Sequence, residues 1–420
     1  MFNKIVFSII TLFAFPTILL AKVYSFDELL ELAHKNSIET EIVKTNLIET
    51  QAKIDQLRSS HFPQISATIG GEKIDIRSSD DFTSSNFVAN LNVDYNLFQF
   101  GAVSKKIDAL YGIKTSQQRF LNLSQREVYR KLKKIFTNGL HLKELHEILS
   151  NELKFNQDLK KQVNKRQIQG LVGKADVLEI DMRDATLKQK LLILSEELDH
   201  NKDLIRKIVL LPHDSPIELK GKIPHEHFSA DPKELIQAAK KFNANYLKLI
   251  SETKSQTLML ESSKFERLPQ LNIRGTFGRP KFIDRLSNES NQNIIGLYLD
   301  IPIWDGGHRS AATQIEKAKL ARKTLRSNKS SNDIVIEIIH RYEKMNNIHQ
   351  QVDLAESNVK NGALYFSSVH EEYKKGVKNS IDLVSARDRL MNFKSELIIA
   401  KKDFIISKYE LEEVAGVEFE

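Results

Sequence analysis

The stretch Phe62-Pro63-Gln64 returns later in the chain as Leu268-Pro269-Gln270, displaced by 206 positions because 269 minus 63 is 206. The same displacement relates five further pairs: Asp94 and Asp300, Phe98 and Trp304, Gly101 and Gly307, Gly170 and Gly376, Asp176 and Asp382. Solenoid repeats are shorter, roughly 20 to 50 residues each. The sequence therefore indicates that one ancestral unit was duplicated to give two similar structural halves.

Proline placement predicts where long helices can form. The nine prolines leave residues 64–211 and 303–420 free of this helix-breaking residue. Each half opens with a helix-capping pattern, Ser25 with Glu28 and Asp231 with Glu234, the second with proline at the first helical position. We expect a helix of about 35 residues after each cap, ending before Pro63 or Pro269.

A second helix is expected in each half, starting after Gly101 or Gly307. Apolar residues spaced by threes and fours continue for roughly 65 residues, which is typical of coiled-coil-like packing. Turns at Gly170 and Gly376 should then reverse the chain into a third helix over about 175–210 and 381–415.

Between the first and second helices the hydrophobic period changes to two. Apolar residues occupy the odd positions of 87–97 and 295–303, while the even positions of 87–97 are mostly Asn and Asp. Residues 65–69 and 271–277 alternate in the same way, and polar loops over 77–86 and 279–292 connect the strands. Each half should thus contain one hairpin of strands about ten residues long, at about 64–98 and about 270–303.

Two interpretations of these hairpins are open, a surface sheet on a soluble core or part of a membrane barrel. Strands of about ten residues can cross a bilayer when tilted, and the polar face would suit a water-filled lumen. In that case the odd positions face lipid and the sheet must close. Since the smallest barrels have about eight strands, four per chain require oligomerisation: two copies would supply eight and three would supply twelve.

Composition and the N-terminus bear on compartment and partners. Residues 1–21 have the basic start and apolar core of a secretory signal peptide. We divide the remainder into a first repeat (22–210), a linker or equatorial segment (211–230) and a second repeat (231–420). The chain has no cysteine, which excludes disulfides and a thioether lipid anchor, and its net charge of +7 comes without a basic, aromatic-rich block. We therefore expect no nucleic-acid partner.

Taken together, these features resemble the TolC family of bacterial outer-membrane efflux and secretion channels. The resemblance covers nearly the whole chain after residue 21 and includes both strand exits and both helix turns. The matching segments are Leu97-Phe98-Gln99-Phe100-Gly101, Ile303-Trp304-Asp305-Gly306-Gly307, residues 170–177 and residues 376–383. It implies an α+β membrane protein in the outer membrane, a homotrimer with one shared twelve-stranded barrel, continued by an α-helical barrel across the periplasm.

The resemblance also implies a closed periplasmic entrance at the turn ends of the helices. There Asp176, Tyr373 and Lys378 would tie neighbouring coils together and Asp382 would line the narrowest point. Partners would be a periplasmic adaptor and an inner-membrane transporter of the ABC, RND or MFS type. Ser385 stands where some members place a further acidic residue, so the number of carboxylate rings at the entrance stays open.

No catalytic or cofactor-binding motif is found in the sequence. Walker A, Gly-x-Gly-x-x-Gly and His-Glu-x-x-His patterns are missing, and the histidines lack metal-ligand spacing. We therefore expect neither an enzyme nor a metal or cofactor. Two functions remain: a passive trimeric conduit of an efflux pump or type I secretion system, or a structural or adhesive periplasm-spanning coiled coil without a pore.

Overall fold

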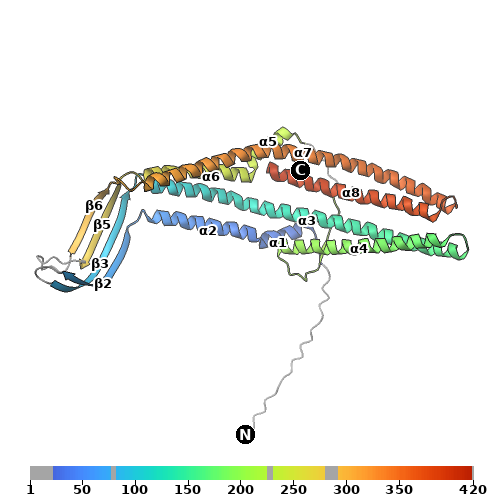
Figure 1. Cartoon of the computed structure of the whole chain (residues 1–420), viewed down its shortest axis with the longest axis horizontal. Helices are drawn as coiled ribbons and strands as arrows, with labels where there is room; N and C mark the ends of the chain where they lie inside the picture. Colours follow the sequence, from blue (N-terminus) through green and yellow to red (C-terminus); the bar gives the residue numbers. More distant parts are fainter. Residues whose placement is uncertain (1–21, 77–81, 225–229, 280–291, 419–420) are drawn as a thin grey trace, which may run out of the picture. The chain divides into compact units, whose positions relative to one another are not determined.

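The computed structural model describes residues 22–76, 82–224, 230–279 and 292–418. The expected signal peptide and most of the second predicted loop lie outside these ranges. The elements of the described chain, drawn in Figure 1, are β1 Lys22–Tyr24, α1 Phe26–Asn36, α2 Ile38–Ser59, β2 Gln64–Ile76, β3 Phe82–Phe98, α3 Ala102–Ile168, α4 Lys174–Val209, β4 Ile217–Leu219, α5 Pro232–Phe242, α6 Ala244–Phe265, β5 Gln270–Arg279, β6 Gln292–Asp300, α7 His308–Lys374 and α8 Ser380–Ala415.

Each helix of the first half has a counterpart displaced by 206 in the second. Helix α3 starts at Ala102 and α7 at His308, and both contain 67 residues. Helices α4 and α8 contain 36 residues each. The long second helices and the third helices predicted from the proline-free stretches are therefore confirmed.

The predicted single first helix of about 35 residues is wrong. Two helices replace it in each half, of 11 and 22 residues. The break falls at Ser37 and at Asn243, whose side chains accept hydrogen bonds from the backbone N–H groups three residues on, at 3.1 Å and 3.0 Å. Such polar side chains start a new helix by satisfying its free N–H groups. The Ser25–Glu28 capping pair is present, with Ser25 N donating to Glu28 Oε2 at 2.8 Å.

The two hairpins join in one antiparallel sheet with strand order β2-β3-β5-β6. One hairpin per half is confirmed, but the strand lengths differ from prediction. Strands β2 and β3 contain 13 and 17 residues, and β5 and β6 contain 10 and 9. Residues 82–86 belong to β3 rather than to the predicted loop, and β6 ends at Asp300 rather than near residue 303.

The strand register places the predicted apolar residues on one face across all four strands. Val93 pairs with Ile65 and Gly275, and Gly275 pairs with Ile295. On the opposite face Asn92 pairs with Ser66 and Thr276. Because side chains alternate across a strand, a matching register preserves the two-faced character of the sheet.

Contacts within the chain divide it into two compact units, which do not coincide with the two repeats. One unit combines Met1–Asn36, Lys131–Glu226 and His349–Ile406, and the other combines Ser37–Arg130, His227–Ile348 and Ser407–Glu420. We call them the turn unit and the sheet unit after the features they contain. In the turn unit, β4 from the linker segment pairs in parallel with β1, two strands that the sequence did not predict.

Helices of the sheet unit follow the same order as the strands. Helix α3 is bonded to α2 through Lys114 Nζ and Gln51 Oε1 at 2.6 Å, and to α6 through Ser262 Oγ and the carbonyl of Ala102 at 2.7 Å. Helix α6 in turn contacts α7 through Ser263 and Thr313. The order α2-α3-α6-α7 therefore continues β2-β3-β5-β6. Among the described residues, no helix has both the length and the apolar character needed to span a membrane.

Candidate functional site

The two helix turns of the turn unit have the same backbone design. Gly170 and Gly376 adopt φ of +74° and +78°, in the left-handed region where glycine is favoured. The residue after each glycine donates its N–H five residues back, Leu171 to Arg166 and Val377 to Glu372, both at 2.9 Å. A Cβ at either glycine would meet no atom within 4 Å, so backbone conformation rather than space requires glycine there.

Each predicted entrance carboxylate caps the helix that follows its turn. Asp176 Oδ2 accepts the N–H of Gly173 at 3.1 Å, and Asp382 Oδ2 accepts the N–H of Asn379 at 3.3 Å. Acidic groups at these positions complement the positive end of the helix. Both carboxylates are half-buried.

Asp176 also connects the two turns. Its Oδ1 accepts a hydrogen bond from Ser380 Oγ, the first residue of α8, at 3.2 Å. Ser380 is buried and was missed by the sequence interpretation, which singled out only charged and aromatic residues beside the turn. The α3–α4 and α7–α8 turns of one chain are therefore held side by side by a direct contact.

Tyr373 is buried rather than displayed at the turn. Its side chain is 3% exposed and packs in an apolar cluster from α3, α4, α7 and α8 that includes Val163, Ile180 and Leu383. The guanidinium of Arg166 lies 4.6 Å from the ring centroid. Its hydroxyl is buried without a hydrogen-bond partner among the described residues. Lys378 is exposed, so the predicted ties from these two residues to a neighbouring coil stay predictions.

A buried charge network lies further along the same helices, and the sequence interpretation missed it entirely. Arg183 donates to Asp388 Oδ1 through Nε at 3.0 Å and through Nη2 at 2.6 Å, and its Nη1 donates to Asn156 at 3.0 Å. Arg387 binds both oxygens of Glu152, at 2.9 Å and 2.7 Å.

The network joins three helices of the turn unit. Glu152 is 3% and Asn156 0% exposed on α3, Arg183 belongs to α4, and Arg387 belongs to α8. Arg387 also lies over the rings of Phe155 and Phe366, at 4.8 Å and 5.0 Å. Breaking such a buried pair leaves an uncompensated charge. The sequence offered one weak indication of this network: Arg183 lies two helical turns after Asp176, on the same face of α4.

The strand-to-helix junctions show the same left-handed backbone at Gly101 and Gly307, with φ of +82° and +87°. The preceding residues, Phe100 and Gly306, also have positive φ, +50° and +66°. The left-handed backbone conformation of Phe100 is strained for residues other than glycine. Its ring centroid lies 4.7 Å from that of Phe98. Both junction glycines predicted from the sequence therefore occupy turns that require them.

The polar face of the sheet carries two groups of side-chain hydrogen bonds. Asn92 donates to Thr68 at 3.2 Å and accepts from Thr276 at 3.3 Å. Asp300 accepts from Asn272 and from Arg274, both at 2.6 Å. A hollow of about 260 Å³ is lined partly by Asp94 and Arg274 of this face. The face is therefore both polar and internally bonded.

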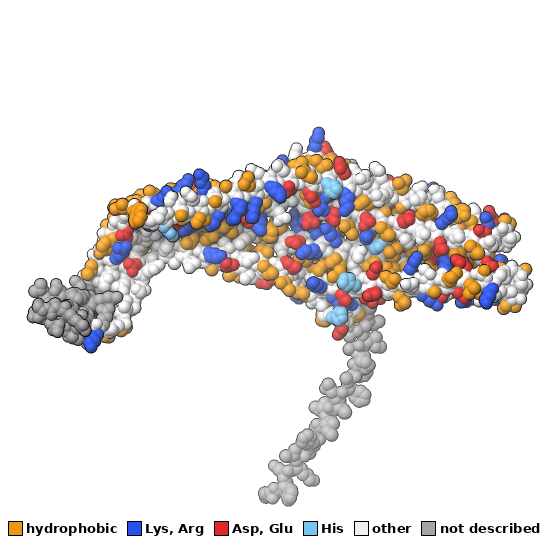
Figure 2. All heavy atoms as spheres, in the orientation of Figure 1, with side chains coloured by type: hydrophobic (Ala, Val, Ile, Leu, Met, Phe, Trp, Pro, Cys, Tyr) orange, Lys and Arg blue, Asp and Glu red, His pale blue; other side chains and the backbone are white. Residues whose placement is uncertain are grey.

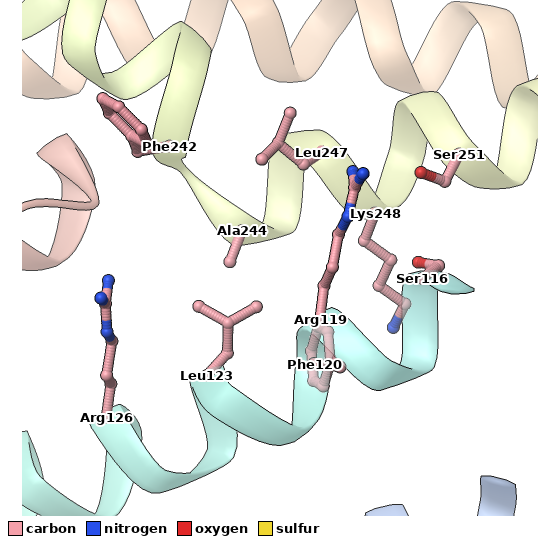
Figure 3. Close-up of a pocket in the computed structure, with 10 residues that line it drawn as sticks. All are labelled: Ser116, Arg119, Phe120, Leu123, Arg126, Phe242, Ala244, Leu247, Lys248 and Ser251. Atoms are coloured by element: carbon pink, nitrogen blue, oxygen red, sulfur yellow. The ribbon is translucent and has the colours of Figure 1, made fainter. Parts of the chain in front are cut away.

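A second hollow, of about 290 Å³, lies in the sheet unit between α3 and the α5–α6 segment. Figure 3 shows Leu123 on α3 pointing toward Ala244 on α6, with Arg119, Arg126 and Lys248 around them. Lys248 lies 4.6 Å from the Phe120 ring centroid, and Arg126 donates to the carbonyl of Gly416 at 3.4 Å. The described residues contain no group of three or more His, Cys, Asp or Glu that could hold a metal ion.

A model of the family described as "Outer membrane efflux protein" matches residues 29–201 and 261–417. The chain belongs to the outer membrane efflux protein family. The two matched segments fall in the two repeats, and the resemblance stated from the sequence is confirmed. The protein is accordingly an outer-membrane protein from a family of channels, which are not enzymes.

Individual relatives agree with this assignment. The alkaline protease secretion protein AprF of Pseudomonas aeruginosa is 24% identical over 362 residues, which cover 82% of this chain and 72% of AprF. The outer-membrane protein VceC of Vibrio cholerae superposes with a TM-score of 0.80 at 15% identity, over 94% of this chain and 97% of VceC. The CmeC outer membrane channel of Campylobacter jejuni superposes with a TM-score of 0.81 at 14% identity, over 94% and 86%. At these identities the structures establish the fold.

Proposed function

We propose that the protein is the outer-membrane exit duct of a tripartite export system: a passive trimeric conduit opened by a periplasmic adaptor and an inner-membrane transporter. The observation that carries the proposal is the sheet β2-β3-β5-β6. It has one exposed apolar face and one hydrogen-bonded polar face, and within the described residues its edge strands β2 and β6 pair with no further strand. Four strands of this kind cannot close into a barrel within a single chain.

The apolar face suits lipid rather than a soluble core. Ile69, Ile295 and Leu297 are 76%, 73% and 64% exposed in the single chain. Contiguous apolar surface of this kind marks a site of protein or membrane contact. In an outer-membrane protein the surrounding bilayer is the matching environment.

The opposite face suits a water-filled lumen. Asn92 and Asp300 each make two side-chain hydrogen bonds on this face, and Arg274 lies 5.1 Å from the Tyr298 ring centroid. Polar side chains alternating with lipid-facing ones are typical of channel barrels. A coiled coil without a pore would not need a polar face on the sheet.

Closure requires further copies of the chain. Strands β2 and β6 form the edges of the described sheet, and edges in lipid leave backbone groups unsatisfied. Three copies joined edge to edge would give a closed barrel, and the helix order α2-α3-α6-α7 would let the helices close in the same sequence. We choose three over two because of the family resemblance.

The turn unit supplies the proposed gate. Asp176 and Ser380 hold the two turns of one chain together, and the exposed Lys378 would contact Asp176 of an adjacent coil. Tyr373, whose hydroxyl is buried, would support the turn from within its apolar cluster. Three copies of Asp382 would then surround the axis and favour cations at the closed entrance.

The cargo proposed here is protein, exported by a type I secretion system with an ABC transporter. AprF is named as a protease secretion protein, and the missing cysteine distinguishes this chain from lipid-anchored drug-pump channels. RND and MFS efflux partners are the alternative, and co-purification of the native transporter separates the two.

Cysteine labelling in intact outer membranes tests the proposal, because the chain has no native cysteine. We expect a cysteine at Leu297 or Ile295 to be protected from a water-soluble maleimide, and one at neighbouring Tyr298 to react. Chemical crosslinking of the same membranes should give trimers. Equal reactivity on both faces, or crosslinking that yields only monomers, would favour the coiled coil without a pore.

A further inference from the structure

Exposed aromatic side chains gather where the strands meet the helices. Phe62 precedes β2, Phe98 ends β3 and Trp304 follows β6, with 67%, 53% and 88% of their surfaces exposed. Figure 2 shows hydrophobic side chains gathered where β6 leads to α7, whereas charges of both signs are mixed over the helices. Aromatic belts at this level are typical of the boundary between lipid and water.

The apolar row of β6 runs directly into this belt. Leu299, Ile301 and Ile303 continue the odd-numbered alternation and are 59%, 58% and 93% exposed. The first charged residue after them is Asp305, followed by Arg309 in the first turn of α7. The transition from lipid-facing to charged residues therefore takes place within one short segment.

A hollow of about 190 Å³ lies at this transition. It is lined by Arg267, Pro302, Ile303, Trp304, Asp305, Arg309 and Ser310. Arg267 Nη2 donates to the carbonyl of Arg309 at 3.3 Å, so the two arginines border the same space. The site thus combines an indole, an aliphatic side chain and two guanidinium groups.

The carboxylate in the hollow is already engaged by backbone groups. Asp305 accepts the N–H groups of Gly307 and Arg309, both at 3.1 Å, and caps α7. The hydrogen bond from Arg309 N–H is the main cause that lowers the pKa of Asp305. Arg309 Nε lies 3.8 Å from Asp305, a loose pair. Two arginines against one capping carboxylate leave the hollow with a net positive charge.

We propose that this hollow binds the phosphate of a membrane phospholipid, whose acyl chains lie along Ile303 and Ile301. Guanidinium groups bind phosphate through paired hydrogen bonds, and an indole at the same level can donate its N–H while its ring contacts lipid. The inference rests on the proposed membrane insertion of the sheet. The site would fix the depth of the barrel at the periplasmic surface of the outer membrane.

Only the second repeat contains the site. The positions equivalent to Arg267 and Arg309 are His61 and Val103, because 267 minus 206 is 61 and 309 minus 206 is 103. Phe98 replaces the indole of Trp304. One phospholipid per chain is therefore expected, and the first repeat should not retain one.

Trp304 is the only tryptophan of the chain, so its fluorescence reports directly on the site. The full-length protein would be inserted into vesicles that contain either phosphatidylglycerol or phosphatidylcholine brominated at different depths along the acyl chains. We expect strongest quenching by the shallowest bromines, and preferential quenching by the anionic lipid. Each arginine should contribute about fivefold to that preference, since a basic residue near an anionic surface is worth about 1 kcal/mol.

The decisive comparison is wild type against Arg267→Gln and Arg267→Gln/Arg309→Gln. A preference reduced about fivefold in Arg267→Gln and lost in the double variant, with Lys264→Gln unchanged, supports the site. Lys264 is an exposed lysine in the last turn of α6, three residues before Arg267 and outside the hollow. Unchanged preference in the arginine variants overturns it. So does a response of Trp304 to inorganic phosphate in detergent equal to that with phospholipid, because the site would then bind free phosphate.

Flotation of the same vesicles and trimer crosslinking separate this result from the proposed function. Protein that fails to float refutes membrane insertion and with it the phospholipid site. Protein that floats as a trimer, but shows no dependence on Arg267, refutes only the site.

Discussion

The two repeats of this chain share a backbone but not their buried chemistry. All eight helix boundaries keep the displacement of 206, whereas residues at equivalent positions differ in burial and charge. Glu152 is buried in the charge network of the turn unit, while its equivalent Asn358 is exposed. The helix lengths and the glycine turns are thus common to both repeats, whereas the buried charge network is specific to the residues of one arrangement of α3, α4 and α8.

The strands diverge more than the helices. Strands β2 and β5 both begin at the glutamine of a Pro-Gln pair, yet they contain 13 and 10 residues, and β3 is nearly twice as long as β6. Within the described residues the two hairpins therefore differ in length, whereas the helices do not.

The largest expected effect separates Glu152 from Asn358. Glu152→Leu leaves Arg387 without its buried carboxylate and also removes the 3.5 Å ion pair between Glu152 and Arg183. This should lower the free energy of unfolding by about 3 to 5 kcal/mol. Asn358→Leu, at the equivalent exposed position, should change it by less than about 0.5 kcal/mol. Urea unfolding followed by circular dichroism measures both. Similar costs at the two positions would show that the charge network does not stabilise the turn unit.

The second prediction tests whether the two hairpins have equivalent faces. Leu91→Arg and Leu297→Arg, 206 positions apart on the apolar face, should each cost roughly 2 to 4 kcal/mol near the bilayer midplane. Arginine at Asn92 or Tyr298, on the polar face, should leave trimer assembly intact and change conductance. The yield of trimer in the outer-membrane fraction checks this, and equal tolerance on both faces would contradict the assignment.

The third prediction concerns pH. Burial lowers the pKa of His141 to about 4, with Lys402 adding to the effect and Asp403 opposing it. The imidazole is 6% exposed, and its Nδ1 has no partner among the described residues. In the unfolded chain the imidazole of His141 takes up a proton near pH 6.5, whereas in the folded chain it does so only near pH 4. The free energy of unfolding is therefore unaffected by this group above pH 6.5 and declines as the pH falls from 6.5 toward 4.

We expect the loss to be about 1 to 2 kcal/mol after allowance for solvent screening. His141→Gln should remove this part of the pH dependence, and Asn347→Gln, at the exposed equivalent position, should not. Unfolding midpoints in urea at pH 7 and pH 4 provide the measurement. Identical pH dependence in wild type and His141→Gln would rule out the buried neutral imidazole as its cause.

The smallest expected effect is one on which the repeats should agree. Gly170→Ala and Gly376→Ala place a side chain at φ of +74° and +78° in open space, so each should cost about 1 kcal/mol from backbone strain alone. Gly173, with φ of −83°, tolerates alanine without this strain. A large difference between Gly170→Ala and Gly376→Ala would show that one turn carries additional contacts.

Patterns local to the sequence predicted much of this fold. Proline-free stretches located α3, α4, α7 and α8, and the period-two alternation located the faces of the sheet. The breaks at Ser37 and Asn243 were missed because a capping side chain inside an otherwise helical pattern gives a weak signal. The short parallel pair β1 and β4 was missed because three-residue strands have no periodicity.

The candidate site was less predictable than the fold. Glycine turns and the carboxylates that follow them were found because they recur at 206, and the structure places Asp176 and Asp382 at helix starts as expected. Ser380, Glu152 and Arg387 do not recur at equivalent positions. Their partners lie on other helices, and a single sequence does not show which helices come together.

Single-channel recording in planar bilayers tests the central claim, that the turn unit holds a conduit shut. Purified wild-type trimer should conduct weakly, and Asp176→Ala combined with Lys378→Ala should raise conductance markedly. Polar contacts of about 0.5 to 1.5 kcal/mol each, repeated in three copies, can shift a two-state equilibrium that about 5.5 kcal/mol would invert. Asp382→Ala should mainly weaken cation selectivity. A correctly assembled trimer whose conductance and selectivity are unchanged by these substitutions would contradict the account.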